Sequence, residues 1–315
     1  MKGRWPTNHV AAAEGMAEGD HEAAVLGFYC RMMTTQPSVS RWQRTSAFCN
    51  KCDFVAQFEI LRELQANLDN LTLFVTGTYD GSDIHRLTQQ KWYRANRTRV
   101  YGWEIQPTVH GRASAQLKQH AEVQIFHAGV SDRAGRVGLA GKKELAHLDA
   151  ALTNATTYVD VVCWADFAES RSIPLVDYAL IDTEGHDVNV MRGMNLGEPG
   201  RFPMLQYEIG PGWVDSAGRL IAPATQVEVA DWLTSLGYKL FIMGRRLLDW
   251  RNSSSLTPIL LPVTPSTFRD SWCTHTRWNM RRNNSMQGNV LAIHVMHLRR
   301  HAWLAHRVRG MEPTL

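Results

Sequence analysis

Residues 176–194 read VDYALIDTEGHDVNVMRGM. The first part, 178–181, is a short apolar run between polar residues, which is typical of a strand buried on both faces of a parallel sheet. Four ionisable residues then surround Gly185: Asp182, Glu184, His186 and Asp187. Open α/β sheets bind ligands at the carboxyl ends of their strands, so this segment predicts one edge of an active site.

Apolar segments and segments of helical periodicity alternate along the chain on both sides of this strand. Strands are predicted at residues 71–75, 99–104, 123–130, 178–182, 204–209, 238–243 and 289–294, with a short hairpin arm at 136–139 and an extra strand at 157–163. Helices are predicted at 53–70, 82–96, 108–120, 187–194 and 225–236, with a helical insertion at 144–152. Such alternation implies crossover connections, so the sequence predicts an α/β fold with a mostly parallel seven-stranded sheet flanked by helices.

The composition indicates a soluble, cytoplasmic protein with a substantial core. Hydrophobic residues make up 44% of the 315 residues, and the five cysteines form no regular framework, which favours a reducing compartment. Cys49 and Cys52 form a CxxC pair without the partners of a zinc or redox site, so chance or packing explains it better. The sequence has no signal-peptide pattern and no apolar run long enough to cross a bilayer.

The net charge of +4 is small, but it is unevenly distributed. Residues 271–311 contain no Asp or Glu and carry several arginines. Two interpretations stay open: a solvated basic tail, which we favour, or a surface for an anionic partner or a membrane. No aromatic-interleaved motif accompanies these charges, so no nucleic-acid partner is expected.

The first predicted strand runs into a glycine-containing turn, Gly77-Thr78-Tyr79-Asp80-Gly81-Ser82. A glycine directly after a buried strand lets a ligand approach the backbone, and the helix that follows presents free N–H groups to it. The second predicted strand ends in Glu104. In nucleoside-binding α/β folds an acid at this place accepts hydrogen bonds from the ribose hydroxyls. Each signal is weak alone, but together they favour a ligand that contains adenosine.

These motifs resemble the FkbM-type methyltransferases, which are S-adenosylmethionine-dependent enzymes of the Rossmann-like class. The segments that carry the resemblance are 77–81, 103–107, 128–132 with Gly135, 204–208, 288–292 and, above all, 181–187 with Gly193. The resemblance covers residues 71–294 and implies a class I methyltransferase fold. With the weak periodicity of the first fifty residues and the clear helical pattern from residue 53, it divides the chain into an N-terminal appendage, 1–52, partly disordered; a methyltransferase domain, 53–294; and a basic C-terminal tail, 295–315. The chain departs from the family at Val75, where an acid is usual, and at Tyr79.

The resemblance implies S-adenosylmethionine-dependent O-methylation of a hydroxyl on a small molecule, a sugar or a lipid. The residues expected to bind the cofactor are Gly77, Thr78, Asp80, Gly81, Ser82, Glu104, Ser131, Asp132 and Asp182. The residues expected to act in catalysis are His186, Asp182, Glu184 and Glu208, with His186 as general base. Asp182 and Glu184 would face the cationic donor, and Glu208 would orient His186 or touch the substrate. No metal is expected, although Asp182 and Glu184 together could hold a divalent cation.

Several alternatives remain open. A non-catalytic binding module could retain this fold with its cofactor affinity lost through Val75. A nicotinamide oxidoreductase shares the acid of the second strand, but it usually carries a full glycine fingerprint, which this chain lacks. Methylation of a nucleic acid would use the basic segment. The sequence does not identify the acceptor or the oligomeric state.

Overall fold

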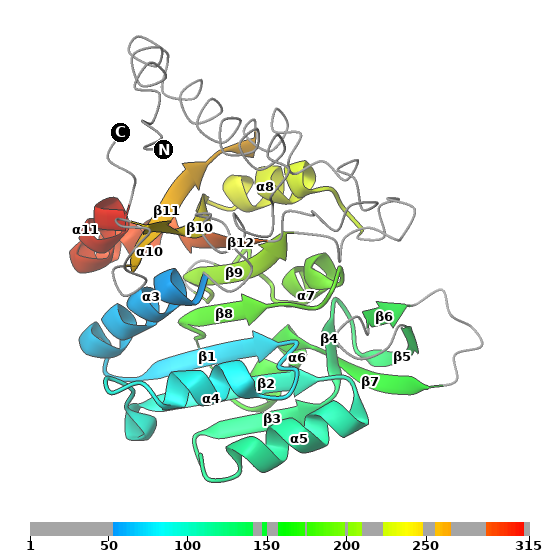
Figure 1. Cartoon of the computed structure of the whole chain (residues 1–315). Helices are drawn as coiled ribbons and strands as arrows, with labels where there is room; N and C mark the ends of the chain where they lie inside the picture. The colour runs from blue at the N-terminus through cyan, green and yellow to red at the C-terminus, as the bar shows by residue number, and fades with distance from the viewer. Residues whose placement is uncertain are drawn as a thin grey trace, which may run out of the picture.

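The computed structural model describes residues 53–140, 147–149, 157–173, 175–198, 201–209, 223–247, 256–265 and 288–311 (Figure 1). The predicted N-terminal appendage, 1–52, and with it Cys49 and Cys52, lies outside the described residues.

An eight-stranded sheet forms the centre of the described part, in the order β11-β10-β12-β9-β8-β1-β2-β3 (Figure 1). Its strands are β1 (Leu71–Thr76), β2 (Thr98–Glu104), β3 (Val123–His127), β8 (Tyr178–Ile181), β9 (Met204–Ile209), β10 (Tyr238–Leu247), β11 (Leu256–Val263) and β12 (Gly288–His294). β9, β8, β1, β2 and β3 run parallel, whereas β12 pairs antiparallel with both β9 and β10. The predicted α/β class with a mostly parallel sheet is confirmed. All seven strands predicted for the sheet are present, and β11 is an eighth that the sequence did not predict.

Helices cover both faces of this sheet (Figure 1). They are α3 (Asp53–Asn67), α4 (Ser82–Thr88), α5 (Pro107–Leu117), α6 (Trp164–Ser170), α7 (Asp187–Gly193), α8 (Gln226–Ser235), α10 (Val295–Arg300) and α11 (Ala302–Met311). Successive side chains of a strand point to opposite faces, so β1 contributes to two cores. Phe74 packs into the core that contains residues of α6, α7 and α8. Leu73 and Val75 pack into the core that contains residues of α3, α4 and α11.

Aromatic side chains pack beneath the carboxyl end of β2. The ring of Trp103 stacks on Phe126 with 5.3 Å between centroids, and Trp164 lies edge-on to both Trp103 and Phe74 at 5.4 and 4.8 Å. Trp103, Phe74 and Trp164 are all buried. This packing fixes the strand end that leads into Glu104.

A second sheet of four strands lies beside the first, in the order β4-β7-β5-β6. Its strands are β4 (Gly129–Ser131), β5 (Gly135–Ala140), β6 (His147–Asp149) and β7 (Tyr158–Cys163). The strand predicted at 123–130 therefore divides, because β3 joins the large sheet and β4 joins the small one. The helix predicted at 144–152 is wrong at His147–Asp149, where β6 pairs antiparallel with β5. Pairing with the preceding strand, β5, satisfies the backbone of these residues, and side-chain periodicity does not report such pairing.

The basic segment after residue 294 forms α10 and α11, and α11 packs on the large sheet. Leu304 and Val308 belong to the same core as α3. Arg307 forms ion pairs with Glu59 and Glu63 of α3. None of the described helices combines the length and the apolar character that a membrane span requires.

Candidate active site

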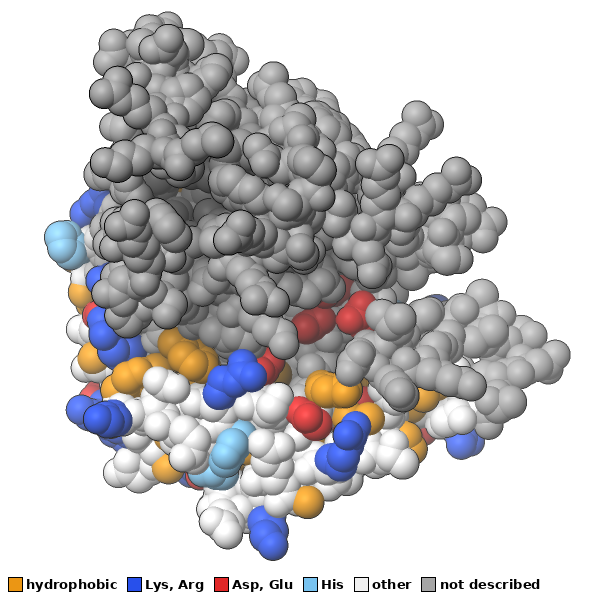
Figure 2. Space-filling view, in the orientation of Figure 1, with side chains coloured by type: hydrophobic (Ala, Val, Ile, Leu, Met, Phe, Trp, Pro, Cys, Tyr) orange, Lys and Arg blue, Asp and Glu red, His pale blue; other side chains and the backbone are white. Residues whose placement is uncertain are grey.

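A cavity of about 250 Å³ opens at the carboxyl ends of β1, β2 and β8. Five of the residues singled out in the sequence lie in its wall: Gly77, Glu104, Asp182, Glu184 and His186. They come from three parallel strands that are neighbours in the sheet, so their ends meet at one edge. Acidic side chains gather on this face, over the ends of β1 and β8 (Figure 2).

The turn after β1 fits closely against the end of β8. Gly77 has a φ of 77°, and a Cβ at this position would lie 1.6 Å from the carbonyl oxygen of Asp182. The N–H groups of Gly77 and Thr78 both donate to the carbonyl of Trp103 at 3.1 Å, and the N–H of Asp182 donates to Thr76 at 3.1 Å. These bonds join the ends of β1, β2 and β8 into one rigid rim.

The rest of this turn is shaped by its own hydrogen bonds. The side chain of Thr78 is buried and donates to Trp103, and a carboxylate oxygen of Asp80 accepts from the N–H of Ser82 at 3.0 Å. Gly81 is the N-cap of α4, with a φ of 82°. Thr78, Asp80, Gly81 and Ser82 support the turn and do not form part of the cavity wall, whereas Tyr79 does.

Glu104 ends β2 and is only 4% exposed. Its carboxylate accepts the N–H of Gln106 at 2.8 Å. Burial raises the pKa of Glu104, and backbone bonds from Gln106, Tyr79 and Ile105 oppose this rise. The protein thus holds a carboxylate in a fixed orientation at the wall of the cavity.

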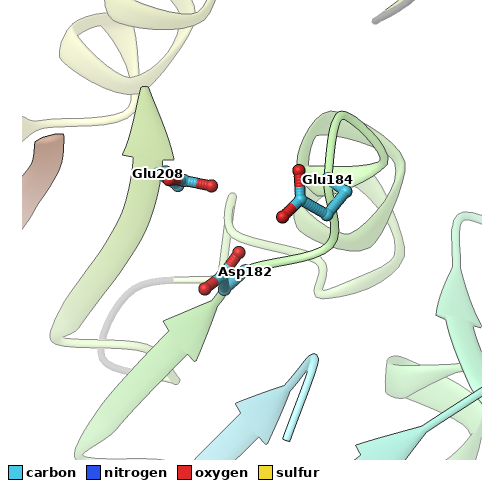
Figure 3. Close-up of side chains that lie close together, drawn as sticks. All are labelled: Asp182, Glu184 and Glu208. Carbon is cyan, nitrogen blue, oxygen red and sulfur yellow. The ribbon is translucent and has the colours of Figure 1, made fainter. Parts of the chain in front are cut away.

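Asp182, Glu184 and Glu208 form an acidic cluster, in which one oxygen from each residue lies within 4.8 Å of the others. Figure 3 shows the three carboxylates facing one another from the end of β8, the following loop and the end of β9. Glu184 has a φ of 52°, an uncommon backbone conformation for a residue with a side chain. The cluster offers the oxygen ligands that a divalent cation takes.

Glu208 and Asp182 are hydrogen-bonded to each other through their side chains. Burial raises the pKa of Glu208 strongly, and the charges of Asp182, Glu184 and Asp187 raise it further. Asp182 is exposed toward the cavity, and the protein that surrounds its carboxyl raises its pKa as well, chiefly through desolvation. The hydrogen bond between the two side chains lowers the pKa of Asp182 and raises that of Glu208, which favours Glu208 as the donor and Asp182 as the acceptor.

Asp187 holds the loop between β8 and α7. It is 1% exposed and accepts from the N–H groups of Thr183 and Gly185 at 3.4 and 3.2 Å. Burial, followed by the charge of Asp182, raises the pKa of Asp187 to about 8.

His186 lies in the cavity wall and is hydrogen-bonded at both ring nitrogens. Its Nε2 lies 3.1 Å from Oγ of Ser131, and its Nδ1 lies 3.3 Å from Nδ2 of Asn189. Ser131 in turn donates to Asp132 at 3.0 Å. Ser131 and Asp132 reach the site through His186 and are not themselves in the cavity wall.

The cavity wall carries four carboxylates, those of Asp83, Glu104, Asp182 and Glu184. Among the described residues that line it, none is a Lys or an Arg. Such a wall attracts a cationic ligand and disfavours a phosphate.

Comparison with known proteins identifies the family to which this chain belongs. A model of the methyltransferase FkbM domain matches residues 76–240. The chain belongs to the FkbM methyltransferase family. Every residue named in the cavity wall, and Glu208 as well, lies inside the span that matches the FkbM model. The curated proteins include no match to this chain.

Three solved methyltransferase structures illustrate what this FkbM chain is similar to. An rRNA methylase from Streptococcus thermophilus is 10% identical, with 78% of this chain and 98% of that chain covered and a TM-score of 0.38. The magnesium protoporphyrin IX methyltransferase from Synechocystis PCC 6803 is 10% identical, with 87% and 97% covered and a TM-score of 0.36. The CurJ carbon methyltransferase is 8% identical, with 92% and 71% covered and a TM-score of 0.41.

Sequence reasoning assigned no role to three residues of this FkbM site. Asp83 lies in the first turn of α4 and faces the cavity, and its charge acts on Asp182. Tyr79 lines the cavity with a φ of 49°. The side chain of Asn189 is hydrogen-bonded to that of His186, which lies three residues earlier in the chain. Only Asn189 had a usable signal, because side chains three residues apart at the start of a helix are neighbours.

Proposed function

We propose that this FkbM methyltransferase binds S-adenosylmethionine and transfers its methyl group to a hydroxyl of a small molecule, a sugar or a lipid. The observation that supports this most is the acidic wall of the cavity at the ends of β1, β2 and β8. S-adenosylmethionine carries a sulfonium, an ammonium and a ribose with two hydroxyls. Carboxylates are suitable partners for all of these groups.

Each wall of the cavity would receive a different part of the cofactor. The methionine portion would lie against the turn at Gly77, which packs directly on Asp182, with Thr78, Asp80, Gly81 and Ser82 holding the turn from behind. The ribose hydroxyls would donate to Glu104. The adenine would lie along Gly129 and Val130, which line the cavity directly before Ser131 and Asp132.

Asp83 is the residue we propose for the ammonium group. The family usually has an acid at the position of Val75, which in this chain is a buried core residue. Asp83 presents a carboxylate to the same cavity from the first turn of α4. This would compensate for the missing acid and keep the chain competent for cofactor binding.

When bound, the cofactor supplies an activated methyl group, so the protein has to position the reactants and accept one proton. Positioning of this kind can lower a barrier by about 7–11 kcal/mol in favourable cases. Asp182 would accept the proton that the acceptor hydroxyl loses when it is methylated. Glu208 supports the carboxylate form of Asp182 by donating to it, and Glu184 orients the hydroxyl.

Calorimetry with purified full-length protein tests the cofactor assignment. We expect S-adenosylmethionine to bind with one site per chain, and Glu104→Ala and Asp83→Asn to weaken it by about tenfold or more, because each removes a charged hydrogen-bond partner. Glu169→Gln is the matched control, since Glu169 is an exposed acid on α6, remote from the cavity wall. Absence of binding to the folded protein would refute the assignment.

Incubation of extracts with isotopically labelled cofactor tests the reaction. We expect a labelled product whose methyl group is bound to oxygen. Cofactor binding without transfer to any extract component would instead indicate a non-catalytic module with this fold.

A further inference from the structure

We infer that His186 is a positioning residue, not the general base: as a neutral imidazole with its proton on Nε2, it fastens the loop that carries Asp182 and Glu184 to the end of β4. Its effect on turnover rests on the proposed function, whereas its tautomer does not.

The tautomer follows from the hydrogen-bond chain that begins at Asp132. A carboxylate only accepts hydrogen bonds, so the single hydroxyl proton of Ser131 goes to Asp132, at 3.0 Å. Oγ of Ser131 must then accept from His186 at 3.1 Å, which places the imidazole proton on Nε2. Nδ1 is therefore the nitrogen with the lone pair, and it accepts from the amide NH2 of Asn189 at 3.3 Å.

This arrangement leaves His186 without a nitrogen for the acceptor hydroxyl. A general base needs a lone pair within hydrogen-bond reach of the proton it takes. The one lone pair of this imidazole already accepts from Asn189. The carboxylates of Asp182 and Glu184 line the same cavity and accept protons without breaking this chain.

The bond to Ser131 connects the site to the small sheet. Ser131 is the last residue of β4, and both ends of α7 contact it. At the first end His186 donates to the Ser131 hydroxyl. At the other end a Cβ on Gly193 would lie 2.0 Å from the Ser131 carbonyl oxygen, so α7 and β4 pack without a gap.

The loop at residues 182–187 is thus held from two sides. Asp187 binds its backbone N–H groups from within, and His186 ties its end to β4. The cavity wall uses Gly129 and Val130 of β4 and Asp182 and Glu184 of the loop. Loss of the His186 bond would let these two walls move apart, which would weaken cofactor binding and displace the carboxylates together.

Two variants separate positioning from proton transfer. In His186→Gln the side-chain NH2 lies near the former Nε2 and can still donate to Ser131, but an amide does not take up a proton. We expect His186→Gln to keep turnover and cofactor affinity within a few-fold of wild type, and His186→Ala to lose about tenfold in cofactor affinity as well as turnover. If His186→Gln is as inactive as His186→Ala and both bind the cofactor normally, His186 is the base and the inference is wrong.

Nitrogen NMR of imidazole-labelled wild-type protein is a second test that needs neither a variant nor a substrate. We expect the signals of a neutral ring protonated at Nε2, with Nδ1 bare. A ring protonated at Nδ1, or one that exchanges between tautomers, would overturn the inference. If no S-adenosylmethionine binds in calorimetry, the proposed function fails, but this tautomer measurement still decides the state of His186.

Discussion

Gly77 and Asp182 meet without space for a side chain, because a Cβ at residue 77 would lie 1.6 Å from the Asp182 carbonyl oxygen. This contact joins the turn after β1 to the loop after β8 and so brings together two walls of the cavity. Residues more than one hundred positions apart in the sequence are therefore fixed in one rim.

Gly77→Ala is expected to destabilise the protein by about 2–5 kcal/mol, since it adds both a clash and an unfavourable positive φ. Denaturant unfolding measures this loss. Gly111→Ala is the control, because a Cβ at residue 111 meets nothing within 4 Å and the residue lies in α5. Alanine is the better helix former, so the control should be as stable as wild type or more stable. Equal effects of the two substitutions would contradict the close contact.

Glu208→Gln is expected to flatten the pH dependence of stability. The pKa of Glu208 rises above its ordinary value of 4.5 on folding, so the folded protein keeps a proton that the unfolded chain releases. The retained proton therefore adds to the free energy of unfolding. This stabilisation is fully present below the unfolded pKa of Glu208. It is lost as pH rises toward the folded pKa, at about 1.4 kcal/mol per pH unit within that window.

Asp187 acts in the same direction up to its folded pKa of about 8. Wild type should therefore lose stability from about pH 5 upward, and Glu208→Gln should lose less. Urea unfolding at a series of pH values provides the measurement. Parallel curves for the two proteins would show that Glu208 is not the protonated partner.

Binding of S-adenosylmethionine is expected to release a proton, because a cation in the cavity favours the ionised form of Asp187, whose folded pKa is about 8. Calorimetry in buffers with different ionisation enthalpies measures the released protons directly. Affinity should rise with pH between about 6 and 8. S-adenosylhomocysteine lacks the sulfonium charge and should release fewer protons. An equal release for both ligands would argue against charge coupling to Asp187.

Chelation with EDTA is expected to leave turnover unchanged, because the proposed mechanism passes the hydroxyl proton to Asp182 and uses no metal. The assay compares labelled product before and after chelation, with Mg²⁺ returned in a third sample. Loss of activity with recovery on Mg²⁺ would show that Asp182, Glu184 and Glu208 hold a cation instead.

The sequence correctly predicted those residues of the cavity wall that lie at, or directly after, the carboxyl end of a strand. Asp182 and Glu104 each terminate an apolar run, and parallel strands end at the same edge, so their convergence could be predicted. The bond between His186 and Ser131 joins residues 55 positions apart, at the start of α7 and the end of β4, and no local pattern contains it. β11 escaped prediction for a different reason, since its two prolines, Pro258 and Pro262, argue against a strand and are tolerated because β11 lies at the edge of the sheet.

The position of β12 sets a limit on how this protein can be shortened. β12 comes late in the chain but lies between β9 and β10, and it pairs with both. A fragment that stops at residue 240, where the family match ends, would strip β9 of its neighbour and leave a bare strand edge next to Glu208. Bare edges invite aggregation. Recombinant versions intended for binding work should therefore extend through α11, whose Leu304 and Val308 close the core under α3.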